Sequence, residues 1–409
     1  MKIVCSSSMP FAREAFGTLG EVTVLEGRSI SAEDVKDATL LLVRSTTKVD
    51  RELIEGSRVK FVGTATIGID HLDVEYLRDR GVHWCAAPGC NATSVSEYIT
   101  AALLCLAERH CFSLQGRTIG VVGVGNVGSR VILKAQALGM QVLANDPPRQ
   151  RTEGDNVSLQ TDAGMIETEV RFVDLEHLLA EADVVTLHVP LTREGRDKTF
   201  HMLDDKVLNR VKPGCIVINS ARGAVVDTNA LIGTIRSSKV SHAVIDTWEC
   251  EPAYSAELLG VVDLGTPHIA GYSFDGKVRG TEMVYLEACR FLSCNPGWDS
   301  ADVLSSYNNP VYILDAAGRS DEELLCEIIR SSYDICADDR HLRETLVDDP
   351  RLRAKEFDRL RKDYPVRREF PFTRLNLCHA TESLRDRVSR LGFVQQCDST
   401  ALPRHTSYH

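Results

Sequence analysis

The sequence predicts an α/β protein with two doubly wound parallel sheets and a small third domain of mixed α+β type. Two observations lead to this class. Short, nearly continuous apolar runs alternate with helical patterns up to about residue 270, which is typical of parallel sheets covered on both faces. The length of 409 residues also exceeds that of one ordinary domain. We therefore expect two or three domains.

The first sheet is predicted from five apolar runs in the first 90 residues. Helix-like pieces separate them, such as VEYLRDRG after Asp73. Each run is short and bounded by polar residues, as strands buried on both faces are. The candidate strands are residues 2–5, 22–25, 39–45, 60–66 and 82–87.

A second series of apolar runs, again separated by helical patterns, predicts a second sheet. Its candidate strands are residues 117–125, 141–146, 183–190, 215–221, 242–248 and 262–270. The segment at about 150–171 is polar and longer than such a connection needs, so we expect an exposed loop insertion there.

A helix beginning near Ser94 links the two series. Ser94 and Glu97 have the spacing of a capping box. The helix is apolar nearly all round, so we expect it to be buried between domains or between subunits. A buried position inside one domain stays open as an alternative.

The pattern changes after Asp275, where a long helix is expected to return to the first domain. Beyond it, a short strand-like run VYIL and a helix with apolar Leu324, Leu325, Ile328 and Ile329 predict the small third domain. The predicted bounds are 1–93 with 272–298 for the first domain, 94–271 for the second, 299–394 for the third and 395–409 for a flexible tail.

Composition excludes several classes of function. The net charge of −11 argues against nucleic-acid binding, which favours a basic surface. No apolar run reaches the roughly 18 residues of a membrane span, and the N-terminus does not resemble a signal peptide. The 13 cysteines form no C-x-x-C pair, so we expect reduced thiols in the cytoplasm and no metal site.

A glycine loop predicts a dinucleotide site. GVGNVG holds Gly123, Gly125 and Gly128 directly after a predicted strand and at the start of a helix. The first glycine permits a tight turn, the second lets a pyrophosphate approach the backbone, and the third lets the helix pack on the strand. Asn126 and Val127 lie within the loop, where the free N–H groups of the helix N-terminus attract phosphate.

The residue at the end of the following strand predicts which dinucleotide binds. Asp146 should accept hydrogen bonds from the adenosine ribose hydroxyls and repel a 2′-phosphate, which favours NAD. Arg149 and Arg151 follow closely and keep NADP open as an alternative.

Three ionisable residues follow successive strands of the second sheet: Arg222, Glu251 and His268. In parallel sheets the carboxyl ends of strands face one crevice, so all three can point into it. A guanidinium can clamp a carboxylate, an imidazole can take a hydroxyl proton, and a carboxylate can orient the imidazole. Read singly, each could be a surface, turn or core residue. Their common location favours catalysis.

The motifs GVGNVG, INSARGAVVD, DTWECEP and TPHIAG resemble those of the D-isomer-specific 2-hydroxyacid dehydrogenases in order and spacing, from residue 1 to about 290. The resemblance implies a flavodoxin-like substrate domain and a Rossmann NAD domain. It assigns the chemistry to Arg222, Glu251 and His268. It also implies that Asp246 holds the nicotinamide carboxamide and that Gly271 and Val189 lie at the cofactor. Val189 stands where a threonine is frequent.

TPHIAGYSFDGKVRGT and APGCNATSVSEY are similar to the branch of this family that oxidises 4-phospho-D-erythronate at C2 in vitamin B6 synthesis. That branch has a C-terminal dimerisation domain, which residues 300–393 resemble, so a homodimer is implied. By the same correspondence Ser45, Thr66 and Tyr272 would contact substrate.

Other side chains near these motifs are read from the residues alone. Arg44, beside Ser45, is our own hypothesis for a phosphate ligand. We expect Lys277 and Arg279 to be solvated or at an interface.

Two alternatives stay open. One is another dehydrogenase of the family, for 3-phosphoglycerate or hydroxypyruvate, which would share every catalytic residue. The other is a non-enzymatic NAD(H)-sensing dimer, like the corepressors that share this fold.

Overall fold

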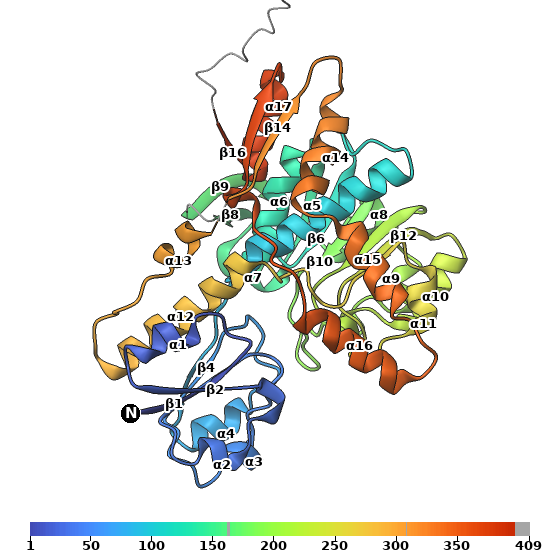
Figure 1. Ribbon diagram of the computed structural model, residues 1–409. Helices are drawn as coiled ribbons and strands as arrows, with labels where there is room; N and C mark the ends of the chain where they lie inside the picture. The colour runs from blue at the N-terminus through green and yellow to red at the C-terminus, as the bar shows by residue number, and fades with distance from the viewer. Residues whose placement is uncertain (162–163, 308, 397–409) are drawn as a thin grey trace, which may run out of the picture.

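The computed structural model describes residues 1–161, 164–307 and 309–396. Its described residues form three parallel sheets, one after another along the chain, and one antiparallel hairpin. Figure 1 shows the first sheet in blue at one end of the molecule, the second in the middle and the small third sheet at the other end.

The first sheet has the strand order β2-β1-β3-β4-β5, with all neighbours parallel. This is the flavodoxin-like order, and all five predicted strands are present. Apolar side chains on both faces form its core. The strands are β1 (Lys2–Ser6), β2 (Glu21–Leu25), β3 (Leu40–Val43), β4 (Phe61–Thr64) and β5 (His83–Cys85), and the helices are α1 (Ala12–Gly17), α2 (Ala32–Val35), α3 (Arg51–Ile54) and α4 (Val74–Asp79).

The second sheet has the order β13-β12-β11-β10-β6-β7 and contains all six predicted strands. A parallel bridge between Ala144 and Phe172 adds one more position beside β7, as in a Rossmann sheet. The strands are β6 (Thr118–Val122), β7 (Gln141–Asn145), β10 (Val184–Leu187), β11 (Cys215–Asn219), β12 (Val240–Ile245) and β13 (Leu264–Gly265). The helices are α6 (Asn126–Ala137), α7 (Pro147–Glu153), α8 (Leu175–Glu181), α9 (Asp205–Leu208), α10 (Thr228–Arg236) and α11 (Ala256–Val261).

The expectation of an exposed loop at 150–171 is wrong. The segment ends helix α7 and then forms a hairpin of β8 (Asn156–Thr161) and β9 (Gly164–Arg171). Leu159 and Val170 are buried in the same core as helix α6. Their apolar side chains anchor the hairpin. The sequence also has Val157, Met165 and Ile166 in this segment, but the many polar residues between them led to the expectation of a loop.

Helix α5 (Ala92–Arg109) is the predicted linking helix, and most of its residues are buried. It packs against α6 on one side and against α14 (Asp321–Ser332) and α15 (Ile335–Glu344) on another, so it is covered within the chain. The predicted capping box is wrong. The helix begins two residues before Ser94, whose hydroxyl donates to the Asn91 carbonyl at 2.9 Å, and the buried Glu97 accepts from the Phe370 N–H at 2.7 Å.

Helix α12 (Phe274–Leu292) returns to the first sheet as predicted. Val284, Tyr285 and Ala288 are buried in its core. The chain then enters the small third sheet, whose strands β14, β15 and β16 are all parallel. Its strands are β14 (Val311–Asp315), β15 (Arg374–Cys378) and β16 (Val394–Gln395), and the remaining helices are α13 (Ser300–Ser306), α16 (Pro350–Lys362) and α17 (Glu382–Leu391).

The division at 1–93 with 272–298, 94–271 and 299–394 stays a proposal. It is supported by the fact that the two large sheets lie within one range each and that the third sheet passes its bound only by Gln395. The tail predicted from residue 395 differs at its start, because Gln395 belongs to β16 and the Gln396 N–H donates to the Leu375 carbonyl at 2.8 Å. Residues 397–409 lie outside the described residues.

No helix in the described parts of the chain is both long enough and apolar enough to cross a membrane.

A buried polar segment joins the third unit to the other two. Arg368 Nε donates to Asp275 at 3.0 Å, and this pair is buried. The Glu369 N–H donates to the same carboxylate at 2.8 Å, and the Ser273 hydroxyl donates to the Glu369 carboxylate at 2.8 Å. Arg367 donates to the Ser94 carbonyl at 2.5 Å. The starts of α5 and α12, where the chain passes between the first two sheets, are therefore both bonded to residues 367–369.

We expect Arg368→Ala to lower the free energy of unfolding by about 3–5 kcal/mol, because it leaves the Asp275 carboxylate buried without its cation. Urea unfolding followed by circular dichroism measures this. The matched control is Arg290→Ala, which removes an exposed ion pair with Glu287 and should cost about 0–1 kcal/mol. Equal effects of the two substitutions would contradict the stabilising role of the buried pair.

Candidate active site

The glycine loop connects β6 to α6 as the sequence predicts. Gly123 has φ 88°, and a Cβ there would lie 2.6 Å from the His188 carbonyl. A Cβ on Gly128 would lie 2.0 Å from the Gly123 carbonyl, whereas one on Gly125 would meet open space. The loop thus packs tightly against the protein at Gly123 and Gly128, whereas the space next to Gly125 is empty. No side chain caps α6, so its first N–H groups face that open side and fit a pyrophosphate.

Val189 lies beside this loop, since its side chain would be 2.9 Å from a Cβ on Gly123. Asn126, the first residue of α6, lies against Gly89 of the first domain. Both positions border the space above the glycine loop.

Asp146, at the end of β7, is bonded to the loop. Its carboxylate accepts from the Val124 N–H at 2.8 Å and from the Arg149 N–H at 3.1 Å. Arg149 is ion-paired with Glu153, and Arg151 is ion-paired with Asp197. Both arginines already have carboxylate partners, which weakens the case for a 2′-phosphate here and agrees with NAD.

His268 and Glu251 form a direct pair. His268 Nδ1 lies 2.5 Å from Glu251 Oε1, and Glu251 Oε2 accepts from the Trp248 N–H at 3.2 Å. Burial raises the pKa of Glu251, but the His268 ring and the Arg361 guanidinium more than offset this and hold the pKa below its usual value. The carboxylate therefore stays charged and fixes the orientation of the ring.

The turn that carries His268 is held by Asp246. Its carboxylate accepts from the Thr266 hydroxyl and the Ile269 N–H, both at 2.7 Å, and from the Ala270 N–H at 3.0 Å. The His268 N–H donates to the Asp246 carbonyl at 2.8 Å. These bonds hold His268 at φ 55°, a conformation that is uncommon outside glycine and recurs at active sites.

Arg222 follows β11 and reaches toward the first domain. Its guanidinium donates to Asp70 at 3.1 Å and to the Ala221 carbonyl at 2.8 Å. The next residue, Gly223, has no room for a Cβ because the backbone of Trp248 and Glu249 lies against it. The loop of Arg222 therefore packs directly on the loop that ends in Glu251.

The predicted substrate residues of the first domain follow β3 and β4. Ser45 is exposed and comes two residues after β3 ends. The Thr66 hydroxyl lies 2.7 Å from that of Thr64 and donates to the Gly68 carbonyl at 2.9 Å. Gly68 also contacts Arg222, so the Thr66 loop borders the predicted carboxylate clamp.

Tyr272 and Arg44 lie together. The Arg44 guanidinium is 5.5 Å from the centre of the Tyr272 ring. Lys277, expected to be solvated or at an interface, is half-buried, and its Nζ lies 4.4 Å from the same ring. The solvated reading is therefore wrong. Arg279 pairs with Glu369, so it lies at an interface within the chain. Gly271, just before the ring, packs against the Asn91 side chain.

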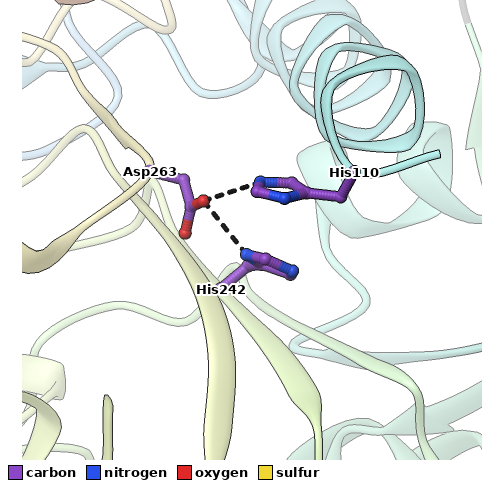
Figure 2. A group of neighbouring side chains, drawn as sticks. All are labelled: His110, His242 and Asp263. Carbon is purple, nitrogen blue, oxygen red and sulfur yellow. Dashed lines mark hydrogen bonds and ion pairs between the residues drawn. The ribbon is translucent and has the colours of Figure 1, made fainter. Parts of the chain in front are cut away.

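A different cluster holds side chains of the types that bind metals (Figure 2). His110 Nε2 and His242 Nδ1 lie 2.9 Å and 3.0 Å from the same oxygen of Asp263. The sequence alone does not indicate this cluster, because its members are far apart in the chain. It lies at the start of β12 and just before β13, whereas the catalytic candidates follow the ends of these strands. It is therefore separate from the candidate active site.

Comparison with known proteins shows the family to which the chain belongs. Residues 105–270 match the family model described as the D-isomer specific 2-hydroxyacid dehydrogenase NAD-binding domain, and residues 308–392 match a domain of unknown function, DUF3410. The erythronate-4-phosphate dehydrogenase of Azotobacter vinelandii is 43% identical over 96% of this chain and 99% of the relative. That of Cronobacter sakazakii is 44% identical over 90% and 92%. The chain belongs to the erythronate-4-phosphate dehydrogenase family. Its cofactor is NAD.

Solved structures agree at the level of the fold. A D-lactate dehydrogenase from Aquifex aeolicus, complexed with NAD and lactic acid, has a TM-score of 0.56 and 26% identity over 71% of this chain and 95% of that one. An NAD⁺-bound 3-phosphoglycerate dehydrogenase from Entamoeba histolytica has a TM-score of 0.59 and 26% identity over 72% and 95%. Both neighbours are matched almost over their whole length but cover less than three quarters of this chain.

Three residues near the site were missed from sequence. Asp70 contacts Arg222, Arg361 contacts the Tyr272 ring at 5.4 Å, and Tyr364 packs edge-on against the same ring at 5.9 Å. Arg361 and Tyr364 come from the end of α16 and the residues just after it. Their segment reads as an ordinary charged helix and turn, so no local signal distinguished them.

We expect Gly128→Ala to weaken NAD binding by about 10-fold or more, because its new Cβ would push the Gly123 carbonyl out of the pyrophosphate loop. Titration calorimetry with NAD measures the change. Gly260→Ala is the control, since a Cβ there would meet nothing within 4 Å. Unchanged NAD affinity in the Gly128 variant would show that the loop does not carry the cofactor.

Proposed function

We propose that this protein oxidises 4-phospho-D-erythronate at C2 with NAD, forming (R)-3-hydroxy-2-oxo-4-phosphobutanoate, as a cytoplasmic step of vitamin B6 synthesis. The observation that supports this activity is the His268–Glu251 pair. The loop that ends in Glu251 packs on the loop of Arg222, and both follow strands of the sheet that holds the glycine loop. The near full-length similarity to erythronate-4-phosphate dehydrogenases supports the choice of substrate.

The residues that would hold NAD are those of the glycine loop, together with Asp146, Val189, Asp246 and Gly271. NAD, when bound, supplies the acceptor for the hydride that leaves C2. Asp246 already uses both carboxylate oxygens to hold the His268 turn, so its contact with the carboxamide would use a remaining lone pair.

The chain's own residues do the rest of the chemistry. Arg222 would bind the substrate carboxylate through two parallel N–H bonds, exchanging Asp70 for the substrate. His268 is held through Nδ1, so Nε2 is the atom that takes the C2 hydroxyl proton. The imidazolium that results is stabilised by the charged Glu251 beside it. Ser45, Thr66 and Tyr272 would contact the substrate, and Arg44 would contact its phosphate.

The alternatives make different predictions. A 3-phosphoglycerate or hydroxypyruvate dehydrogenase would show its highest kcat/KM on one of those substrates. An NAD(H)-sensing dimer would bind the cofactor but would neither reduce NAD with the two hydroxy acids nor oxidise NADH with hydroxypyruvate. Absorbance of the reduced nicotinamide, measured with each substrate in turn, separates these cases.

We also propose a homodimer that forms through the third sheet. Its edge strand β14 exposes Val311 and Ile313 on one side, at 50% and 73% of their full area. Exposed apolar side chains in a row on an edge strand are typical of an association surface. Helix α5, which was the first candidate for the dimer contact, is covered within the chain.

We expect His268→Asn to lower kcat on 4-phosphoerythronate by about 100-fold, because the general base is lost while the fold is retained. The assay is the same absorbance measurement. His379→Asn is the control, since His379 is an exposed residue that pairs with Asp315 on the third sheet. Near-normal turnover of the His268 variant would refute the assignment of the base.

We expect Ile313→Asp to convert the dimer to a monomer, because a carboxylate would then have to be buried in the interface. Sedimentation velocity gives the mass of each species. Val347→Asp, at a partly exposed apolar residue between α15 and α16, should leave the dimer intact. A monomeric wild-type protein, or a dimeric Ile313 variant, would contradict the proposed surface.

A further inference from the structure

Three cationic side chains surround the ring of Tyr272. The distances to the ring centre are 4.4 Å for Lys277 Nζ, 5.4 Å for the Arg361 guanidinium and 5.5 Å for the Arg44 guanidinium. All three residues are half-buried. Such a cluster of like charges is costly in a partly desolvated place unless an anion joins it.

The three cations come from three separate segments of the chain, two of the first domain and one of the third. Arg44 follows β3 of the first sheet, Lys277 lies in the first turn of α12, and Arg361 lies in the last turn of α16. Figure 1 shows α15 and α16, in orange to red, running from the small third sheet along the middle domain. The third unit therefore reaches the site through α16.

Helix α16 is held in this place from two sides. Phe357 is buried in the core of the second sheet. Asp358 accepts two bonds from Arg28 of the first domain, at 2.8 Å and 2.9 Å, and Lys362 pairs with Glu26 at 2.9 Å. The end of α16 therefore spans the first and second domains, and this fixes where the Arg361 side chain can reach.

None of the three cations forms an ion pair with a carboxylate of the described chain within 4 Å. The Arg44 guanidinium donates only to the Ser8 carbonyl, at 3.3 Å, and its Nε is buried without a partner, as is that of Arg361. Burial, and then the charges of Arg44 and Arg361, lower the pKa of Lys277 to about 7. The charges of Glu251 and Asp358 act on Arg361 from farther away, so the three groups present unpaired Nε–H donors and a net positive charge to one small region.

This region adjoins the catalytic pair. Tyr272 follows His268 by four residues, and its N–H donates to the Ile269 carbonyl at 2.8 Å. The Arg361 charge also acts on Glu251, the partner of His268. An anion held beside Tyr272 would belong to a substrate whose reacting carbon lies at His268 and whose carboxylate is held by Arg222. The cluster therefore fits a second anionic group on the same small molecule.

We propose that Arg44, Lys277 and Arg361 together bind the phosphate group of the substrate, so that the C-terminal unit supplies a specificity-determining residue to the active site. This rests on the proposed function and deepens it. A phosphate offers three acceptor oxygens, which matches three donors that approach from three directions. The three cationic side chains all pack against the ring of Tyr272.

The test compares Arg361→Ala and Lys277→Ala with Arg359→Ala in the full-length, NAD-loaded protein. Arg359 lies on the same helix but is exposed and pairs with Glu356 of its own helix. Each of the first two variants should raise KM for 4-phosphoerythronate by about 10- to 100-fold, the loss expected for one charge-assisted bond, with a smaller change in kcat. Arg361→Lys should recover part of the affinity, and Arg359→Ala should behave as wild type.

Binding of inorganic phosphate, measured by calorimetry, gives a readout that does not depend on turnover. The wild type should bind it, and Arg361→Ala should bind it more weakly by a similar factor. If the wild type binds phosphate at this cluster but does not oxidise 4-phosphoerythronate, the proposed function fails and the subsite stands. If the wild type oxidises the substrate and Arg361→Ala changes neither KM nor phosphate binding, the subsite fails. Melting temperatures equal to wild type show that the variants are folded.

The pH dependence supplies a further check. Lys277 carries its charge below a pKa of about 7 and loses it as pH rises through that value, with Arg44, Arg361 and Tyr272 as the groups that face it. KM for 4-phosphoerythronate should therefore rise between pH 7 and 9 in the wild type. In Lys277→Arg the charge persists, so KM should stay level over this range. The same rise in both proteins would overturn the role of Lys277.

Discussion

The buried ion pair between Asp275 and Arg368 is the constraint on which the arrangement of the three units depends. A carboxylate and a guanidinium without access to water must stay together, since separating them would leave two uncompensated charges. Asp275 begins the helix that returns to the first sheet, and Arg368 follows α16 by a few residues. The pair therefore sets how the third unit lies against the passage between the first and second domains, and with it where Arg361 can reach.

A separate set of hydrogen bonds fixes the position of the catalytic histidine. The Asp246 carboxylate accepts from the Thr266 hydroxyl before His268 and from the Ile269 and Ala270 N–H groups after it. Trp248 donates its indole N–H to the Thr266 carbonyl at 2.8 Å. These bonds are made inside the domain and do not involve the third unit. The protein thus holds its proton-transfer group rigidly on one sheet and places the cations around Tyr272 on three separate segments, two of the first domain and one of the third. Chemistry and substrate selection are supported by different parts of the fold.

Features that depend on interactions between residues close in the sequence could be predicted, and features that depend on distant residues could not. The strands of both large sheets, the glycine loop and the motifs around Arg222, Glu251 and His268 were predicted, because each depends on a pattern within a few residues. The hairpin at 156–171 and the capping role assigned to Glu97 were misjudged. In both cases a contact with a distant segment, α6 in one and Phe370 in the other, outweighed the local pattern. For Lys277 the sequence left solvent and an interface open, since its neighbours Arg44 and Arg361 are remote in the chain.

By itself the sequence determined that this protein has two doubly wound sheets, a pyrophosphate loop at the start of a helix, and an arginine, a glutamate and a histidine after successive strands. The sheets follow from the alternation of apolar runs with helical patterns, and the loop and the three ionisable residues follow from motifs that come directly after strands. Only the tertiary structure decided that α16 crosses to the first domain and that Arg361 joins Arg44 and Lys277 around Tyr272. Charge clustering of this kind depends on distances between segments that sequence spacing does not contain. The burial that makes the cluster effective exists only once the three units have packed.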